Sequence, residues 1–363
     1  MFLEREQEEG LDGERGPAIE WALRTLCRLG DDTGAARLVP VRSAHVPGWC
    51  GRRFPVPPRA DGTIEDVFAV MTTANPGGGA ETMVGEKSSW ERRGLRISYT
   101  CTPYLVGNHA GRGEAVAWGG RAAVSFANSI MGARSEMESF ESATASAVTG
   151  LTPERGAHLD RGRDPTVALV VPDGTEVDLA LLGWSLARSF PREVPLICGI
   201  RPTFDEAKRL AFAVNFLGTI PFFRMQRGTK PPAGMETISI DEKLTEPANG
   251  PVPDLVILGC PHLSEQEINR WSKKLSDRPP SRAEVWFFTS RLCMEKCPVF
   301  GAVLRSRGKM FVDRCPLSMK EGLAGKAIAC DSPALAECLC QEGFSAYYMP
   351  EAGLLELMVR SRQ

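Results

Sequence analysis

The chain has 363 residues, of which 43% are hydrophobic and 24% are charged, and its formal net charge is −2 at pH 7. This size predicts a large core divided between two or three lobes. The small net charge excludes a global basic field for nucleic acid, and no apolar run is long enough to cross a membrane. The start, MFLEREQEEG, has no signal-peptide pattern. We therefore expect a cytoplasmic protein that binds neither nucleic acid nor membranes.

Eleven cysteines are a high count for such a protein. Without a secretory signal, they indicate thiols or metal ligands rather than disulfides. The absence of a C-x-x-C pair argues against a zinc ribbon or a thioredoxin-like motif. Cys293 and Cys297, four residues apart on an expected helix, are interpreted as packing residues rather than ligands.

Residues 1–165 are expected to form an N-terminal lobe. Apolar residues at helical spacing predict a helix over 4–30, which Gly30 would end. A strand over 37–41 should deliver Ser43 and His45 to a loop. The remaining expectations are a surface loop over 50–62, a short helix or strand over 63–71, a helix over 141–148 and a polar connector over 150–164.

The stretch 101–134 organises this lobe. Cys101 lies in a Thr-Cys-Thr-Pro turn, a glycine-rich loop follows, and a helix of small residues is expected from near Gly119 to about Gly132. Small side chains would let other backbone approach this helix closely. This combination is typical of a site, although a buried cysteine beside a surface loop is the alternative.

Two further segments each allow a functional and a purely structural interpretation. The glycine-rich turn over 72–79 could cradle an anion with backbone N–H groups or be a plain turn, and it lacks the lysine and spacing of a P-loop. His45 could line a substrate cavity or be a structural histidine.

Residues 166–363 have a different pattern, in which short apolar strands alternate with helices. Strands are expected over 166–171, 195–200, 220–224, 254–258, 284–289, 310–312 and 327–329, and helices over 176–190, 204–217, 264–275, 291–304 and 351–360, with a polar linker over 226–253. Alternating strands and helices predict an α/β fold with mainly parallel sheets flanked by helices.

Three residue groups follow predicted strands, at the sheet edge where ligands bind in open α/β sheets. Cys260 follows the strand over 254–258, Ser290 follows the strand over 284–289, and Cys315 follows the short strand ending at Val312. A proline comes directly after each of these two cysteines, which predicts loop positions. With Cys101 they are three loop cysteines whose wide spacing carries no local signature, so metal ligation and ordinary buried thiols both remain open.

The chain resembles the large subunit of the aconitase X family. The central stretch contains C-T-P-Y at 101–104, G-E-x-x-A-W at 113–118 and A-N-S-x-x-G-A-R at 127–134. Other similar segments keep the family's order and extend along nearly the whole chain: 11–14, 37–40, 43–46, 73–76, 259–262, 289–291 and 312–316. The resemblance implies an aconitase-like, multi-lobed α/β architecture.

It also implies an iron–sulfur cluster, of uncertain nuclearity, held by Cys101, Cys260 and Cys315. Three thiolates leave one iron with an open position, which can act as a Lewis acid in a dehydration. The implied activity is a carbon–oxygen hydro-lyase of the aconitase type. The implied catalytic residues are His262, Ser290 and Arg291, with His262 either orienting the site or assisting proton transfer. The residues expected to bind substrate are Ser43, His45, Asn75, Glu114, Asn128, Ser129, Arg134 and Thr289. For Arg134 and Arg291, which could clamp a substrate carboxylate, a surface or structural salt bridge is the alternative.

In the superfamily the base is a serine on a small swivelling domain, which can be a separate subunit. We see no such domain after residue 360 and expect a heteromeric enzyme. The chain departs from the family at Gly119-Gly120-Arg121, at Ser135-Glu136-Met137, and at Cys330-Asp331-Ser332-Pro333-Ala334, where a lysine is lost.

These departures leave three hypotheses for the function. The first is a dehydratase of a small hydroxy acid such as cis-3-hydroxy-L-proline. The second is a mevalonate 5-phosphate dehydratase, which would need additional cations for the phosphate. The third is a non-catalytic binding or assembly subunit.

Overall fold

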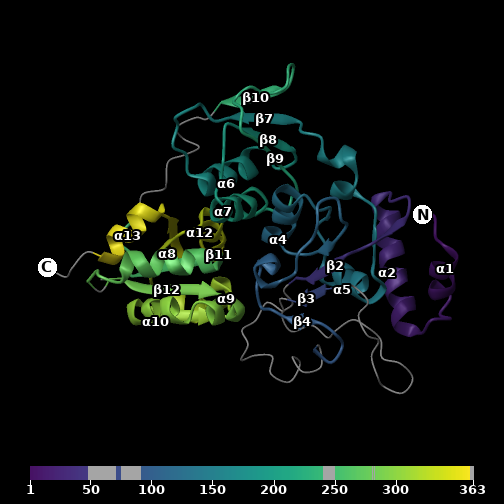
Figure 1. Cartoon of the computed structure of the whole chain (residues 1–363), viewed down its shortest axis with the longest axis horizontal. Helices are drawn as coiled ribbons and strands as arrows, with labels where there is room; N and C mark the ends of the chain where they lie inside the picture. The colour runs from purple at the N-terminus through teal and green to yellow at the C-terminus, as the bar shows by residue number, and fades with distance from the viewer. Residues whose placement is uncertain (48–70, 75–90, 240–249, 280, 282, 360–363) are drawn as a thin grey trace. The chain divides into compact units, whose positions relative to one another are not determined.

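The computed structural model describes residues 1–47, 71–74, 91–239, 250–279, 281 and 283–359. The chain folds as two compact units (Figure 1). Unit 1 comprises Met1–Pro165 with Pro221–Phe223, and unit 2 comprises Thr166–Ile220 with Arg224–Gln363. No helix in the described ranges is long and apolar enough to cross a membrane.

Unit 1 begins with two helices where one was expected. Helix α1 (Arg5–Leu11) ends before Gly13 and Gly16, which both have positive φ, and α2 (Pro17–Thr33) starts anew with Pro17 in its first turn. The apolar face of α2 packs against α5 (Phe140–Thr149) in one buried cluster. Gly34, in the left-handed conformation, ends α2, four residues beyond the predicted stop at Gly30.

The sheet of unit 1 is parallel throughout the described strands, in the order β4-β3-β2-β5. Its strands are β2 (Ser43–Val46), β3 (Met71–Ala74), β4 (Arg96–Ile97) and β5 (Ala117–Trp118). The expectation of a loop at Ser43 and His45 was wrong, because β2 pairs on both sides and is buried. The predictions over 50–62 and 63–70 lie outside the described residues.

The rest of unit 1 surrounds this sheet. β1 (Leu38–Pro40) pairs antiparallel with β6 (Leu151–Pro153), inside the expected polar connector. The expected helix from near Gly119 to about Gly132 is confirmed as α4 (Arg121–Phe126), continued by a π-helical turn, η3 (Ala127–Met131), that ends at Gly132. Short 3₁₀ helices are η2 (Pro103–Val106), η4 (Gly156–His158) and η5 (Asp160–Arg163).

The described strands of unit 2 form two parallel sheets. The first has the order β10-β7-β8-β9 and comprises β7 (Val167–Val170), β8 (Pro195–Cys198), β9 (Arg224–Gln226) and β10 (Glu236–Ser239). Its connecting helices, α6 (Leu179–Ser189) and α7 (Phe204–Val214), pack on each other. β10 lies in the expected linker, and β9 begins at Arg224, where the predicted strand over 220–224 was to end.

The second sheet has the order β13-β12-β11-β14-β15. Its strands are β11 (Leu255–Leu263), β12 (Glu284–Thr289), β13 (Lys309–Val312), β14 (Ala327–Cys330) and β15 (Ser345–Tyr348). The helices that connect and follow them are α8 (Glu265–Leu275), α9 (Arg291–Lys296), α10 (Pro298–Arg307), η7 (Pro316–Ser318), α11 (Lys320–Leu323), α12 (Pro333–Gln341) and α13 (Glu351–Val359).

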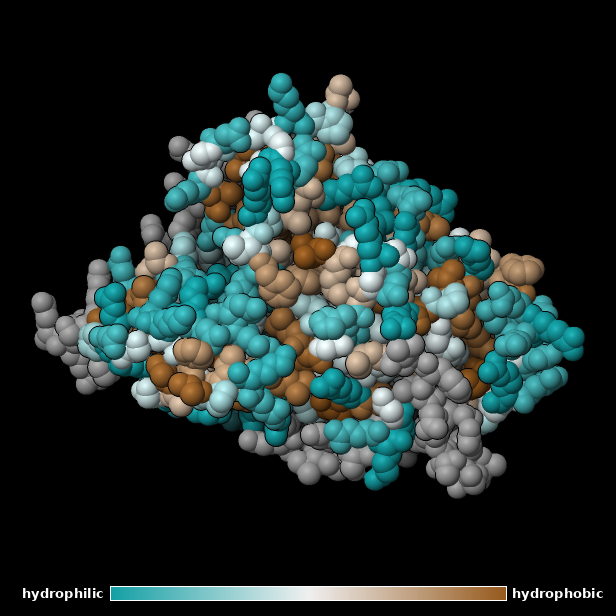
Figure 2. Space-filling view, viewed as in Figure 1, coloured by the Kyte–Doolittle hydropathy of each residue, from teal (hydrophilic) through white to brown (hydrophobic). Residues whose placement is uncertain are grey.

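This strand order reverses its direction between β11 and β14, which is the topological switch point of a doubly wound sheet. Right-handed crossovers place α8 and α10 on one face and α12 on the other. Accordingly α8 packs on α10, while α12 contacts α6 and α7. The surface of α8 in Figure 2 is covered by hydrophilic side chains, as expected for the outer side of an amphipathic helix.

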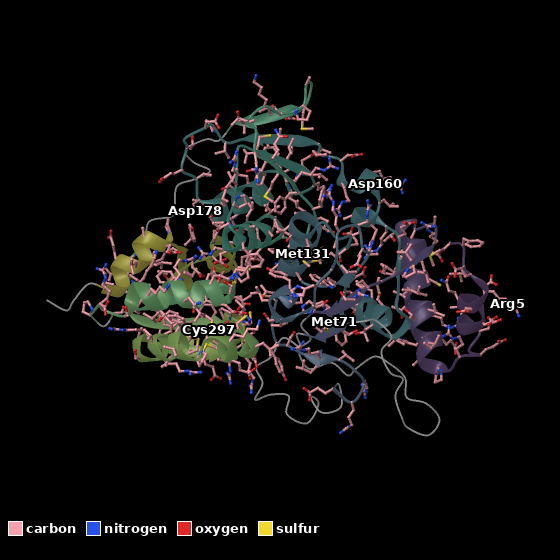
Figure 3. The ribbon with its side chains drawn as sticks, viewed as in Figure 1. Arg5, Met71, Met131, Asp160, Asp178 and Cys297 are labelled. Atoms are coloured by element: carbon pink, nitrogen blue, oxygen red, sulfur yellow. The ribbon has the colours of Figure 1, made fainter. Side chains whose placement is uncertain are left out.

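Two predictions in this sheet were wrong in detail. β11 extends to Leu263, so Cys260 lies in its irregular final part rather than in a loop after Leu258. The single helix expected over 291–304 is broken at Cys297 (Figure 3), because Pro298 starts the separate helix α10.

Candidate active site

The carboxyl end of β11 turns sharply at Gly259 and Cys260. The pairing of β11 with β12 shifts register between Leu258 and Leu263. Gly259 has φ +109°, and a Cβ there would lie 2.2 Å from the carbonyl oxygen of Phe288. Only glycine fits this position, since both its backbone angle and its close neighbour exclude a side chain. The turn leaves the Cys260 side chain partly exposed.

Asp331, directly after β14, holds this turn across the switch point. Its carboxylate accepts hydrogen bonds from the backbone N–H of Gly259 at 2.8 Å and of Cys260 at 3.4 Å. Burial raises the pKa of Asp331 to about 6, although Arg209 and the Gly259 hydrogen bond act in the opposite direction. The sequence reasoning treated Asp331 only as a departure from the family pattern.

His262 joins the Cys260 turn to the segment that carries Cys315. Its Nε2–H donates to the carbonyl oxygen of Arg314 at 2.7 Å, which fixes the proton on that nitrogen. The ring is buried, and burial lowers the pKa of His262 to about 4. The neutral ring thus links the Cys260 turn of β11 to the loop of Cys315. The Cys315 thiol, like that of Cys260, is partly exposed.

Thr289, at the end of β12, and the two residues after it have backbone and side-chain partners of their own. Thr289 Oγ1 donates to the carbonyl oxygen of Leu263 at 2.7 Å, and Ser290 Oγ caps α9. The backbone N–H and Nε–H of Arg291 donate to the carboxylate of Asp313 at 2.7 and 3.0 Å. This pairing leaves the Arg291 side chain 57% exposed at the edge of the sheet.

In unit 1 a buried polar cluster occupies neighbouring strands. His45 Nδ1 lies 2.7 Å from Thr73 Oγ1, and Asn108 donates to Thr73 Oγ1 and to the carbonyl oxygen of Ala44, each at 3.0 Å. Burial lowers the pKa of His45 to about 3, so the ring is neutral. Asn108 Oδ1 is buried and has no hydrogen-bond partner among the described residues. Asn108 is a polar group that the sequence reasoning missed.

The other predicted residues of unit 1 are placed as follows. Ser43 Oγ accepts from Trp118 Nε1 at 2.9 Å. Cys101 lies at a partly exposed turn just before η2. Glu114 accepts from the Gly111 N–H at 2.7 Å. Asn75 lies outside the described residues.

Asn128 and Ser129 hold backbone within unit 1. Asn128 donates to the carbonyl oxygens of Ser135 and Pro221 at 2.7 and 2.8 Å, and it accepts from the Ser135 N–H at 2.8 Å. Ser129 Oγ accepts from the Phe223 N–H at 2.9 Å. These bonds attach residues 221–223 to the π-helical turn η3.

Arg134 lines a cavity of about 340 Å³ together with Glu154, His158 and Asp160. Its guanidinium donates to the carbonyl oxygen of His158 at 2.6 Å and to the carboxylate of Asp160, whose position Figure 3 labels. Arg134, for which a substrate carboxylate and a salt bridge were the two alternatives, therefore has a carboxylate partner within unit 1.

The structure brings Cys260, His262, Arg291 and Asp331 to the carboxyl edge of one sheet, with Cys315 beside them through Arg314. His45 and Asn108 meet in unit 1, as do Ser43 and Trp118. Within the described ranges no three His, Cys, Asp or Glu side chains form a group that could hold a metal ion.

Comparison with known proteins identifies the class of protein to which this fold and site belong. The model of the aconitase X first domain matches residues 1–161, and that of the aconitase X third domain matches residues 253–351. The chain therefore belongs to the aconitase X family, as its motifs predicted. A crystal structure of the Thermococcus kodakaraensis aconitase X in its holo-form superposes with a TM-score of 0.85 at 28% identity, over 98% of this chain and 99% of that one. This superposition confirms the expected aconitase-like α/β fold.

Two kinds of relative are similar over long stretches. The phosphomevalonate dehydratase large subunit of Methanosarcina mazei is 30% identical over 87% of this chain and 86% of that protein. The cis-3-hydroxy-L-proline dehydratase of Pseudomonas aeruginosa is 30% identical over 71% of this chain and 51% of that protein. Both are dehydratases, which are carbon–oxygen lyases, and the expectation of an enzyme of this class is confirmed.

Proposed function

We propose that the chain is the large subunit of an iron–sulfur-dependent hydro-lyase that acts on a small hydroxy acid. The observation that carries the proposal is the convergence of the Cys260 turn and the Cys315 loop at the carboxyl edge of a doubly wound sheet, where the His262–Arg314 hydrogen bond joins them.

The proposed donors fit an iron–sulfur cluster in two respects. Cys260 and Cys315 offer thiolates, the ligands that such clusters require, and both side chains are partly exposed. The buried cysteines, such as Cys330, are poor candidates, because burial raises the pKa of the Cys330 thiol far above its ordinary value. Cys101, which is also partly exposed, is the third proposed ligand on the strength of its C-T-P-Y motif.

A cluster held by three thiolates would supply an open iron that acts as a Lewis acid on the hydroxyl and carboxylate of the substrate. Arg291 is the proposed carboxylate binder, because Asp313 fixes its Nε and backbone N–H while its side chain stays accessible. Asp331 and His262 would orient the loops of the ligands. The remaining proposed lining residues are Ser43, His45, Asn75, Glu114, Asn128, Ser129, Arg134, Thr289 and Ser290.

The two candidate substrates are mevalonate 5-phosphate and cis-3-hydroxy-L-proline. Similarity along nearly the whole Methanosarcina mazei large subunit favours mevalonate 5-phosphate. The loss of an arginine at 135–137 and of a lysine at 330–334 was expected to argue mildly against mevalonate 5-phosphate, which needs cations for its phosphate. However, the Glu136 carboxylate accepts from the N–H groups of Met137 and Ala157 at 3.0 and 2.7 Å, so its charge is already satisfied locally. We therefore place mevalonate 5-phosphate first and cis-3-hydroxy-L-proline second.

The proposed partner is a small subunit that contributes the catalytic base. The relatives matched along most of their length are named large subunits. The Pseudomonas aeruginosa enzyme has about half of its length outside the matched region, where such a part could be fused.

The test is the iron and acid-labile sulfide content of anaerobically purified protein, with its visible spectrum, for the wild type and for Cys101→Ser, Cys260→Ser and Cys315→Ser. We expect iron and sulfide in cluster ratio in the wild type and a loss of about tenfold or more in each variant. Cys340→Ser, at an exposed thiol, is the matched control and should keep its iron. Full iron in all three variants would refute the ligand assignment. Loaded protein is then assayed with both substrates.

A further inference from the structure

A lysine buried beside the Cys260 turn has no role in the function proposed above. Lys208 lies on α7, and its side chain is 0% exposed. An ammonium group loses its hydration when it is buried, and this costs several kcal/mol unless hydrogen bonds and an opposite charge replace the water. A lysine at this position must therefore have partners that compensate.

Lys208 has two such partners. Its Nζ donates to the backbone carbonyl oxygen of His262 at 2.7 Å and forms a hydrogen-bonded ion pair with the carboxylate of Glu267, which is 1% exposed. Burial alone would raise the pKa of Glu267, but Lys208 and Arg209 lower it to about 2, so the carboxylate stays charged. Glu267 also accepts from the Ser264 N–H at 2.9 Å, just after β11.

The chain of contacts continues from Lys208 toward Cys260 and Cys315, the two proposed ligands in unit 2. Lys208 holds the backbone of His262, two residues after Cys260. The ring of the same His262 holds the carbonyl of Arg314, directly before Cys315. One buried histidine is therefore fixed from the α7 side through its carbonyl and fixes the Cys315 segment through its imidazole.

Neither contact is replaceable by water. His262 is 4% exposed, and the Lys208 side chain is not exposed at all. Breaking the chain of contacts would leave buried polar groups without partners, which costs more than the hydrogen bonds themselves contribute. The two contacts consequently restrain the positions of both segments, as the ligands of one metal group require.

We propose that Lys208 and His262 are positioning residues that fix the Cys260 turn and the Cys315 loop relative to each other. The inference rests on the proposed function for its purpose, namely a preorganised pair of cluster ligands. It rests only on the contacts of unit 2 for the mechanical coupling between the two segments. The two parts can be tested separately.

The first measurement needs no metal. Amide hydrogen exchange of the apo chain should report how firmly the Cys260 turn and the Cys315 loop are held. The probe of the turn is the Gly259 N–H, which donates to Asp331. The probe of the loop is the Ser318 N–H, which donates to the Cys315 carbonyl oxygen at 3.0 Å. In His262→Leu we expect exchange at Ser318 to accelerate by about tenfold or more, because the link to Arg314 is lost. His262→Gln, whose amide can donate to the same carbonyl, should restore much of the protection. Wild-type exchange at Ser318 in His262→Leu would overturn the proposed coupling.

The second measurement tests Lys208. The single variant Lys208→Met would leave Glu267 with less compensation and can fail to fold, so the double variant Lys208→Met/Glu267→Gln, which removes both charges, is used. Lys274→Met is the control, since Lys274 pairs with Glu351 on the same unit and is 38% exposed. We expect faster exchange at Gly259 in the double variant and wild-type exchange in the control. Equal exchange in both would refute the role of Lys208.

The iron content of the variants then tests whether this coupling serves to position cluster ligands. In His262→Leu and the double variant, iron and sulfide should fall by about tenfold, with recovery in His262→Gln. If loosened loops retain full iron, positioning of cluster ligands is refuted. If the wild type itself contains no iron, the proposed function fails, while the exchange results still decide whether the two loops are coupled.

Discussion

At the scale of single residues, His158 makes unit 1 sensitive to acid. Its Nε2 accepts a hydrogen bond from the Glu136 N–H at 3.2 Å, so only the neutral ring fits. Burial lowers the pKa of His158 to about 4, with further lowering by Arg155. The unfolded chain binds the proton first, near pH 6.5. The contribution of His158 to the free energy of unfolding is therefore fully present above about pH 6.5 and is lost as the pH decreases toward 4.

We expect this one histidine to reduce the free energy of unfolding by about 2 kcal/mol between pH 7.5 and pH 5. Urea titrations at several pH values would measure it. His158→Gln keeps an acceptor for the Glu136 N–H and has no titrating group, so its stability should depend less steeply on pH. Parallel curves for the wild type and His158→Gln would contradict the assignment.

The family motifs could be recognised from the sequence, but the hydrogen-bond and ion-pair partners of individual side chains could not. Asp331 and Gly259 are 72 residues apart, and nothing local in either segment indicates that they meet. The contact exists because β14 is the parallel neighbour of β11. For Arg134 a substrate carboxylate and a salt bridge were both expected possibilities, but Asp160 could not be predicted as its partner because η5 lies in a stretch without periodicity.

At the scale of elements, Gly259 determines whether β11 can end in its turn. Gly259→Ala would place a Cβ against the Phe288 carbonyl oxygen at a backbone angle that side chains disfavour. We expect a loss of about 2–4 kcal/mol in the unfolding of unit 2, measured by chemical denaturation. Gly228→Ala is the control, because that glycine has no positive φ and no atom within 4 Å of the added Cβ. Equal stability of both variants would show that the turn tolerates a side chain.

Element-scale prediction worked where buried apolar runs are long. The strands over 284–289 and 166–171 were anticipated because their side chains are apolar and bounded by polar segments. β10 was missed, since Glu236–Ser239 is short and polar and gains its pairing from β7, far away in sequence. The break before Pro298 was not predicted, although the sequence indicates it, because proline disrupts the interior of a helix.

At the scale of the whole molecule, dehydration should depend on a second chain. Units 1 and 2 carry the proposed ligands and Arg291, the proposed binder of the substrate carboxylate. The proposed base would come from elsewhere, because Ser290 Oγ caps α9 and His262 is engaged by Arg314. A dehydration needs a base at the carbon next to the one that loses its hydroxyl. Without a base, this chain should bind iron and substrate but turn over very slowly.

Affinity purification of the tagged chain from its native host would test this dependence. We expect a second polypeptide to co-purify in a fixed ratio, and the complex to dehydrate mevalonate 5-phosphate or cis-3-hydroxy-L-proline at least about 100-fold faster than the separated large subunit. The iron content of both samples serves as the control, so that loss of activity is not confused with loss of metal. Full activity of the separated, iron-loaded chain would contradict the two-chain proposal and would direct the search for the base to residues of this chain.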